Sequence, residues 1–500
     1  MYPPFEDKKT GGRSWLRFFG AGLLFILIFC YPWELQKNWQ GGTYVLAPDT
    51  VTYIGFTAWK DPWQSGRSIG YPAFIYPFLY PDQQKFIKTV FTALDSGTNI
   101  WASPEPPIYT IATEVGIGKK FDTIVLVQRL ILPLAIAVFY LSLCRWFHPV
   151  FSFLALCGAF WLAPPPNPHW ILTEPLSCAL TWLCGAFLLY APTSTRKSLY
   201  YALACLCAAC AFLVRPQTLS LIAICSLIFV YEIIFSRNGR LRVALLRKAV
   251  AFSPLLLAYG YIAWISVTGG GLHLHTLSDV YYSAFNAYAE AEDAEYMPSE
   301  RSRKFTAWFG EHKKELIGVA ETRGGRIPED ASPPRRRLLI GDGLLYRGGM
   351  GATITKFANT KDLAHRPRLS QAVFGKELVA GLQKRHRVEI LVARWKNFLG
   401  ALGYYKDVYK LHHFSNATLI INIMALFIAS AAIITKVQIR WPLIMMTGIH
   451  IMAILVPSFG HIVISRYVEP TEPFLLLAGM CALWAFFRER FVRSKSPCAQ

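Results

Sequence analysis

Four ionisable residues stand out because each lies at the edge of a long apolar stretch, where charge is costly and usually functional. Two are acids, Asp49 and Glu174, and two are arginines, Arg215 and Arg466. A carboxylate can act as a general base or as a metal ligand, and arginine can bind phosphate through two parallel hydrogen bonds. Together they would suit a substrate that has an anionic head and an apolar tail.

Each of these residues also has a purely structural interpretation. Asp49 could cap the helix that follows it. Glu174 could be a solvated acid in the first turn of a helix. Arg215 and Arg466 could extend to lipid headgroups. A shared site is favoured only if all four residues lie on one side of the membrane, which depends on the elements that carry them.

The composition requires an apolar solvent, since 53% of the residues are hydrophobic and only 16% are charged. Uncharged stretches of about 20 residues, enough to cross a hydrocarbon layer, recur along the chain. We therefore predict an all-α polytopic membrane protein with ten spans, at 15–32, 123–143, 150–163, 170–190, 199–214, 218–235, 249–268, 417–435, 441–457 and 471–487. The third span should stop at the proline run 164–168.

Lys and Arg near the span ends give the orientation, because basic loops stay in the cytoplasm. With both termini inside, the short outer connections contain only two basic residues, Arg215 and Arg466. Topology and attraction to anionic membrane lipids then account for much of the net charge of +20, so no nucleic-acid partner is expected. The outer loops 33–122 and 269–416 contain no cysteine, which suits a bacterial inner membrane at least as well as a eukaryotic secretory one.

This topology divides the chain and places Asp49, Glu174, Arg215 and Arg466 at one outer rim. The predicted parts are a cytoplasmic tail 1–14, a seven-span module 15–268 that includes loop 33–122, a loop domain 269–416, three C-terminal spans 417–487 and a basic cytoplasmic tail 488–500. The loop domain should contain helices near 302–320 and 370–400 after a glycine hinge at 269–271.

Two other groups of residues could bind metal. His273 and His275 form an outward His-x-His pair, but no acid lies at ligand spacing. Cys205, Cys207 and Cys210 fall within a span, where packing as small apolar residues is the better interpretation.

Short motifs follow one another in the order seen in the integral-membrane glycosyltransferases of the GT-C superfamily, and the chain resembles that family. The resemblance covers 1–268 well and 417–487 loosely, including a seven-span N-terminal module. The motifs are Asp49 with Tyr53, Gly66-Arg67, Gly70-Tyr71-Pro72, Val127-Gln128-Arg129-Leu130, Thr173-Glu174-Pro175, Val214-Arg215-Pro216 and Ser465-Arg466-Tyr467.

The resemblance implies transfer of a sugar from a polyprenyl-phosphate donor, with inversion, to a lipid, glycan or protein hydroxyl outside the cytoplasm. Asp49 would be the general base and Glu174 a second acid, while Arg215 and Arg466 would neutralise the departing phosphate. The resemblance leads us to expect supporting roles for Tyr53, Arg67, Tyr71, His169 and Tyr467.

Two departures from the family pattern leave alternatives open. Asp49 lacks the paired acid that often stands beside it, so the need for a divalent cation is undecided. The second acid could instead come from the additional first-loop sequence 81–118, which carries Asp82, Asp95, Glu105 and Glu114.

Other functions would also suit a polytopic protein with outer arginines. These are a transporter or flippase of an anionic glycolipid, and a polymerase or ligase of lipid-linked glycans. The sequence has no internal repeat and no mid-span charged pair, which favours the transferase over the transporter.

Overall fold

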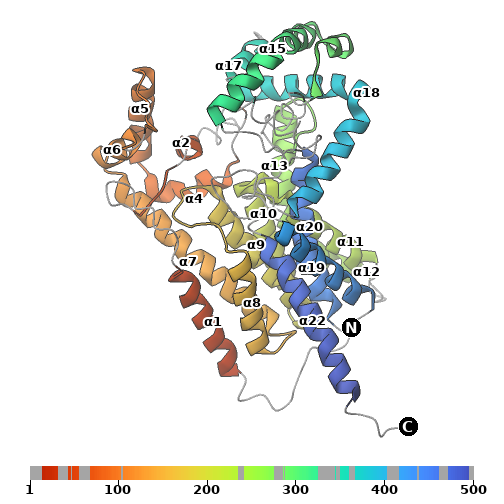
Figure 1. Cartoon of the computed structure of the whole chain (residues 1–500). Helices are drawn as coiled ribbons and strands as arrows, with labels where there is room; N and C mark the ends of the chain where they lie inside the picture. Colours follow the sequence, from red (N-terminus) through yellow and green to blue (C-terminus); the bar gives the residue numbers. More distant parts are fainter. Residues whose placement is uncertain are drawn as a thin grey trace.

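The computed structural model describes residues 14–31, 43–46, 48–55, 63, 68–102, 105–234, 241–274, 285, 288–324, 344, 350–359, 366–402, 416–435, 439–460 and 471–494. Within these ranges the regular structure is helical, and Val45 and Trp170 form an isolated parallel bridge. Figure 1 shows a bundle of helices with a smaller helical group at one end.

Each predicted span overlaps helix within the described residues. The bundle consists of α1 (Ser14–Phe29), α7 (Gly118–Leu143), α8 (Pro149–Leu162), α9 (Thr173–Tyr190), α10 (Lys197–Val214), α11 (Leu219–Ile234), α12 (Leu241–Phe252), α13 (Leu255–Thr268), α19 (Asn416–Ile434), α20 (Arg440–Gly460) and α22 (Glu472–Ser494). By length and apolarity four helical segments in the described part of the chain could cross a membrane, or five if one bent pair counts as a span. The predicted number of ten is therefore not established.

The predicted span 249–268 is not one continuous helix. It consists of α12 and α13, which meet at 64°. Pro254 lies at the break, and proline cannot donate the backbone hydrogen bond that would continue the first helix. By contrast, α8 ends at Leu162, just before the proline run, as the sequence predicts.

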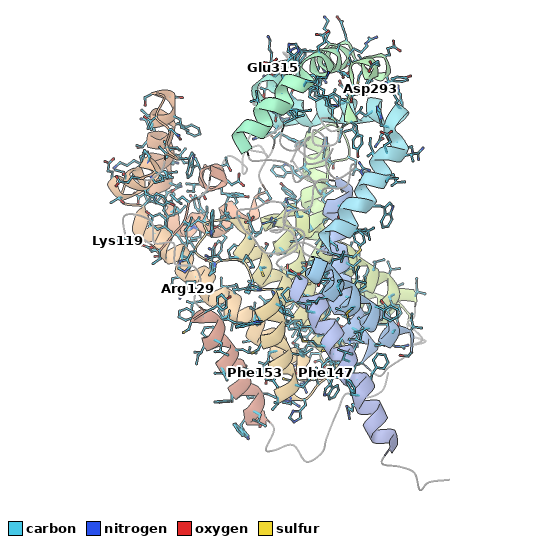
Figure 2. The ribbon with its side chains drawn as sticks, viewed as in Figure 1. Lys119, Arg129, Phe147, Phe153, Asp293 and Glu315 are labelled. Atoms are coloured by element: carbon cyan, nitrogen blue, oxygen red, sulfur yellow. The ribbon has the colours of Figure 1, made fainter. Side chains whose placement is uncertain are left out.

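The surface of the bundle is apolar along its length. Trp161 is 88% exposed and Phe427 is 73% exposed, and both lie on helices of the bundle. Lys119 and Arg129 lie toward one end, whereas Phe147 and Phe153 lie toward the other (Figure 2). Since exposed apolar surface of this extent requires an apolar surrounding, the protein is a multi-pass integral membrane protein.

The first loop packs on the bundle end near the start of α7. Its helices are α2 (Pro48–Ile54), α4 (Gly70–Leu79), α5 (Asp82–Asp95) and α6 (Pro107–Glu114). Aromatic and aliphatic side chains of these helices form one buried cluster with residues of α7 and of the segment before α9. This cluster fixes the first loop against the helices that carry the candidate site.

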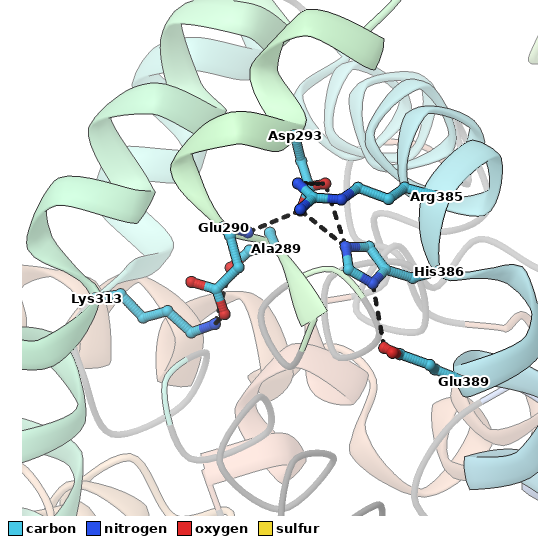
Figure 3. Close-up of polar contacts among 7 residues, drawn as sticks. All are labelled: Ala289, Glu290, Asp293, Lys313, Arg385, His386 and Glu389. Atoms are coloured by element: carbon cyan, nitrogen blue, oxygen red, sulfur yellow. Dashed lines mark hydrogen bonds and ion pairs between the residues drawn. The ribbon is translucent and has the colours of Figure 1, made fainter.

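The smaller helical group, here called the cap domain, consists of η5 (Ala291–Tyr296), α15 (Glu300–Gly324), α17 (Met350–Ala358) and the first half of α18 (Pro367–Ala401). The two helices predicted near 302–320 and 370–400 are thus confirmed. In Figure 3, Asp293 of η5 contacts Arg385 and His386 of α18, with a distance of 3.1 Å from Asp293 Oδ2 to His386 Nε2. At His386 the backbone of α18 leaves helical geometry and the helix kinks.

Candidate functional site

Glu174 and Arg215 form a buried ion pair. Arg215 Nη1 lies 2.7 Å from Glu174 Oε1, and the side chains are only 7% exposed for the arginine and 11% for the acid. Thr173 Oγ1 donates a hydrogen bond to Glu174 Oε2 at 3.2 Å. The interpretations of Glu174 as a solvated acid and of Arg215 as a headgroup-seeking side chain are therefore wrong.

The local backbone explains how Arg215 reaches its partner. The residue before a proline is driven into extended geometry, and Arg215, which precedes Pro216, has φ −146° and ψ 104°. This ends α10 at Val214. The arginine then lies beside the first turn of the neighbouring helix α9, which holds Glu174.

The start of α4 packs directly on the turn that carries Arg215. Ser68 Oγ donates to the Val214 carbonyl at 2.9 Å. A Cβ atom on Gly70 would lie 2.5 Å from the Leu213 carbonyl carbon and from Val214 N, closer than real Cβ contacts allow. Only glycine therefore permits this approach, which the Gly-Tyr-Pro motif alone does not reveal.

Tyr71 connects α4 to the core beside the ion pair. Its hydroxyl donates to Gln128 Oε1 at 3.0 Å, and Gln128 Nε2 donates to the carbonyls of Pro168 and Trp170 at 2.9 and 3.1 Å. Burial, and then the neighbouring Tyr53 and Glu174, raise the pKa of Tyr71 well above its usual value. Gln128 was not predicted to support the site, although an amide within an apolar helix is a signal that could have suggested it.

Asp49 lies in the first turn of α2 and is partly exposed. The next residue, Thr50, donates from Oγ1 to the Ile171 carbonyl at 3.0 Å. One turn later, the Tyr53 ring packs edge-on against Tyr71, with 5.2 Å between ring centroids. These two contacts join the helix of Asp49 to the segment before Glu174 and to the tyrosine beside the ion pair.

His169 serves as a buried structural contact. Its Nδ1 lies 2.6 Å from the Thr43 carbonyl oxygen, and Thr43 is held in turn by Asp122 Oδ1, which accepts from its N–H at 2.9 Å and from Oγ1 at 2.7 Å. Burial lowers the pKa of His169. A neutral imidazole that donates from Nδ1 therefore fixes the start of the first loop on the segment before α9.

Of the predicted residues, Arg67, His275, Arg466 and Tyr467 lie outside the described part of the chain. The four first-loop acids considered as alternatives do not contact Arg215 through any ion pair among the described residues: Asp82 pairs with Lys120 at 2.7 Å, and Asp95, Glu105 and Glu114 are exposed.

In the ranges that the structure describes, no three His, Cys, Asp or Glu side chains gather as a metal site. His273 packs edge-on against Trp63, with 4.7 Å between centroids, and contacts Lys376 Nζ.

The comparisons with known proteins come only from structure. No protein-family model and no curated protein sequence matches this chain. Among solved structures, it is similar to the archaeal oligosaccharyltransferase AglB from Archaeoglobus fulgidus in complex with an inhibitory peptide and a dolichol-phosphate, with a TM-score of 0.37 and 12% identity over 97% of this chain and 52% of that one.

The apo form of the Archaeoglobus fulgidus oligosaccharyltransferase gives a TM-score of 0.35 at 12% identity, again over 97% of this chain and 52% of that one. The chain thus spans about half the length of these structures. Matches at TM-scores below 0.5 do not establish a shared fold or activity.

Proposed function

We propose that the protein is a membrane glycosyltransferase that moves a sugar from a polyprenyl-phosphate donor to a hydroxyl of a lipid, glycan or protein acceptor, on the non-cytoplasmic side and with inversion. The observation that carries the proposal is the buried Glu174–Arg215 pair, joined through Tyr71 and Thr50 to the helix of Asp49. A guanidinium beside a carboxylate at one end of an apolar bundle suits a donor with an anionic phosphate and an apolar tail.

Asp49 is the proposed general base. Its carboxylate accepts the proton of the acceptor hydroxyl while the acceptor oxygen forms a bond to the anomeric carbon of the donor. On the opposite face of the sugar, the bond from that carbon to the phosphate oxygen breaks, and the electron pair stays with the phosphate. Attack opposite to the leaving group inverts the configuration, as it does with a carboxylate base in inverting glycosidases.

Arg215 would stabilise the charge that develops on the leaving phosphate, with Arg466 as a second proposed cation. The guanidinium is planar and carries five N–H donors, and its Nη1 contacts both Glu174 and Thr173. In the proposed complex, the donor phosphate accepts hydrogen bonds from another edge of the group. Glu174 then acts as a positioning acid that fixes the orientation of Arg215. A divalent cation is not part of the proposed step, and the chelator arm of the assay below tests whether one is needed.

The test uses purified protein, polyprenyl-phosphate donors carrying labelled mannose, glucose or aminoarabinose, and crude bacterial envelope as acceptor. Asp49→Asn is nearly isosteric and removes the base, so transfer should fall by at least about 100-fold, the lower range for general-base catalysis. Asp95→Asn, an exposed acid of the same loop, is the matched control and should transfer normally. Transfer that survives Asp49→Asn would refute the base assignment.

A flippase is the second candidate, because the bend of 64° between α12 and α13 is a broken apolar helix of the kind common in transporters. The same labelled donors, incorporated into one leaflet of vesicles, distinguish the two. Intact donor that reaches the opposite leaflet without sugar transfer would favour the flippase. Chelator added to the transfer assay decides the cation requirement.

A further inference from the structure

The second half of α18 exposes an apolar stripe. Val388 is 72% exposed, Leu391 47%, Trp395 48% and Leu399 54%, and these positions recur every three or four residues on one side of the helix. The first half of the same helix is different, because its apolar residues, such as Leu378, are buried in the cap domain core. Ile390, on the opposite side of the second half, is also buried in that core, so the stripe is the outward side of a segment that still contacts the cap domain.

The end of α18 is inserted among helices of the bundle. Leu402 is buried against Ile454 of α20, and its carbonyl accepts a hydrogen bond from Asn422 Nδ2 of α19 at 2.7 Å. Ile454 and Asn422 each lie six residues from the helix end on this side. The apolar segments of these helices are Leu419–Ile434 and Arg440–Val456, so at 1.5 Å per residue the end of α18 lies about 3–5 Å inside the apolar part of the bundle.

The surface around this junction is also apolar. On α19, Ile420 and Met424 are both 56% exposed, and Phe427 is 73% exposed. The same helix binds the end of α18 through Asn422, so the exposed apolar surface continues from the bundle onto α18. Because α18 rises at most about 20 Å from Ala401 to Val388, the stripe begins near the hydrocarbon boundary and crosses the headgroup level.

The residue types on the second half of α18 are those found at the interface between hydrocarbon and headgroups. Trp395 lies within the stripe, and tryptophan is enriched at membrane interfaces. Arg387 is exposed and Arg394 is partly exposed on the same half of the helix, where each could contact a lipid phosphate.

We propose that residues 388–399 of α18 form a membrane-contact surface that binds bilayer phospholipids with anionic headgroups and so anchors the cap domain to the membrane. The sequence places this segment in a loop domain outside the membrane, so the surface is not part of the predicted topology. The proposed membrane contact does not depend on glycosyl transfer, and it would hold equally for a flippase.

The test places a photoreactive benzoylphenylalanine at Trp395 in the full-length protein, reconstituted in vesicles of phosphatidylglycerol and phosphatidylcholine. The matched control carries the probe at Glu315, an exposed position of α15 at the far side of the cap domain (Figure 2). Irradiation should give lipid adducts at 395 in several-fold excess over 315, read by mass spectrometry. Equal labelling at both positions, or crosslinking of 395 to a second copy of the chain instead of lipid, would overturn the proposal.

The arginines test the headgroup preference separately. Arg387→Gln and Arg394→Gln, each combined with the probe at 395, should lower the excess of phosphatidylglycerol over phosphatidylcholine adducts about fivefold per arginine, the factor that about 1 kcal/mol per interfacial basic residue implies. An unchanged headgroup ratio would refute the anionic preference.

Discussion

The Glu174–Arg215 pair allows a quantitative test of the site's architecture. We consider Glu174→Leu, Arg215→Met and the double variant. Both charges are about nine-tenths buried, with a 2.7 Å contact between Arg215 Nη1 and Glu174 Oε1. Each single variant removes the ion-pair contact of the opposite buried charge, and breaking a buried pair from one side typically costs about 3–5 kcal/mol.

The double variant should be far less damaging than the two single losses together. Replacing a whole buried ion pair by apolar side chains of similar volume is often neutral, so the double variant should lose no more than about 3 kcal/mol. The free energy of coupling between the two residues is then at least about 3 kcal/mol.

The assay is reversible unfolding in mixed micelles of mild detergent and dodecyl sulfate, followed by circular dichroism. Glu300 and Lys304 form an exposed ion pair on α15, with side chains 75% and 68% exposed, and the same cycle there should show no measurable coupling. If the losses in free energy of unfolding of the two single variants simply add in the double variant, the buried ion pair is refuted.

Two further predictions concern α4. Tyr71→Phe should destabilise the protein by about 1–3 kcal/mol, because it leaves the buried Gln128 Oε1 without its donor. Since the folded protein raises the pKa of Tyr71, the stability that depends on its protonated form is complete below pH about 10 and is lost as pH rises above this. Tyr71→Phe should therefore flatten the alkaline loss of stability, and an unchanged alkaline profile would contradict the assignment. Gly70→Ala should lower the melting temperature and sugar transfer together, because its Cβ would overlap the Leu213–Val214 backbone, whereas Gly22→Ala on α1, which meets no atom within 4 Å, should do neither. Equal effects of the two substitutions would show that the close approach is unimportant.

The helices of the bundle are predictable because long uncharged runs are a direct property of the sequence. The bend between α12 and α13 is not, since Pro254 lies in a run whose mean hydropathy resembles that of a straight span. The exposed stripe of α18 is also not predictable from the sequence, because it does not form an uncharged run. Its apolar residues are interleaved with Arg387 and Arg394, so the segment is typical of a soluble helix.

The candidate site is likewise predictable only in part. Charge at the ends of apolar runs identifies Glu174 and Arg215, but their contact depends on the packing of α9 beside α10 and on the extended backbone that Pro216 imposes. The contributions of Thr50 and Gln128 depend on backbone carbonyls of the segment 168–171. Such contacts join parts of the chain that are distant in sequence, and no local pattern specifies them.

The central claim is that the protein cleaves a polyprenyl-phosphate sugar and transfers the sugar to an acceptor. The most direct measurement follows both products in proteoliposomes of the wild-type protein, with donor labelled in the sugar and in the lipid. We predict that glycosylated acceptor and free polyprenyl phosphate appear in equal amounts. Donor that stays intact while acceptor is present, with no polyprenyl phosphate released from any donor of the series, would contradict the claim.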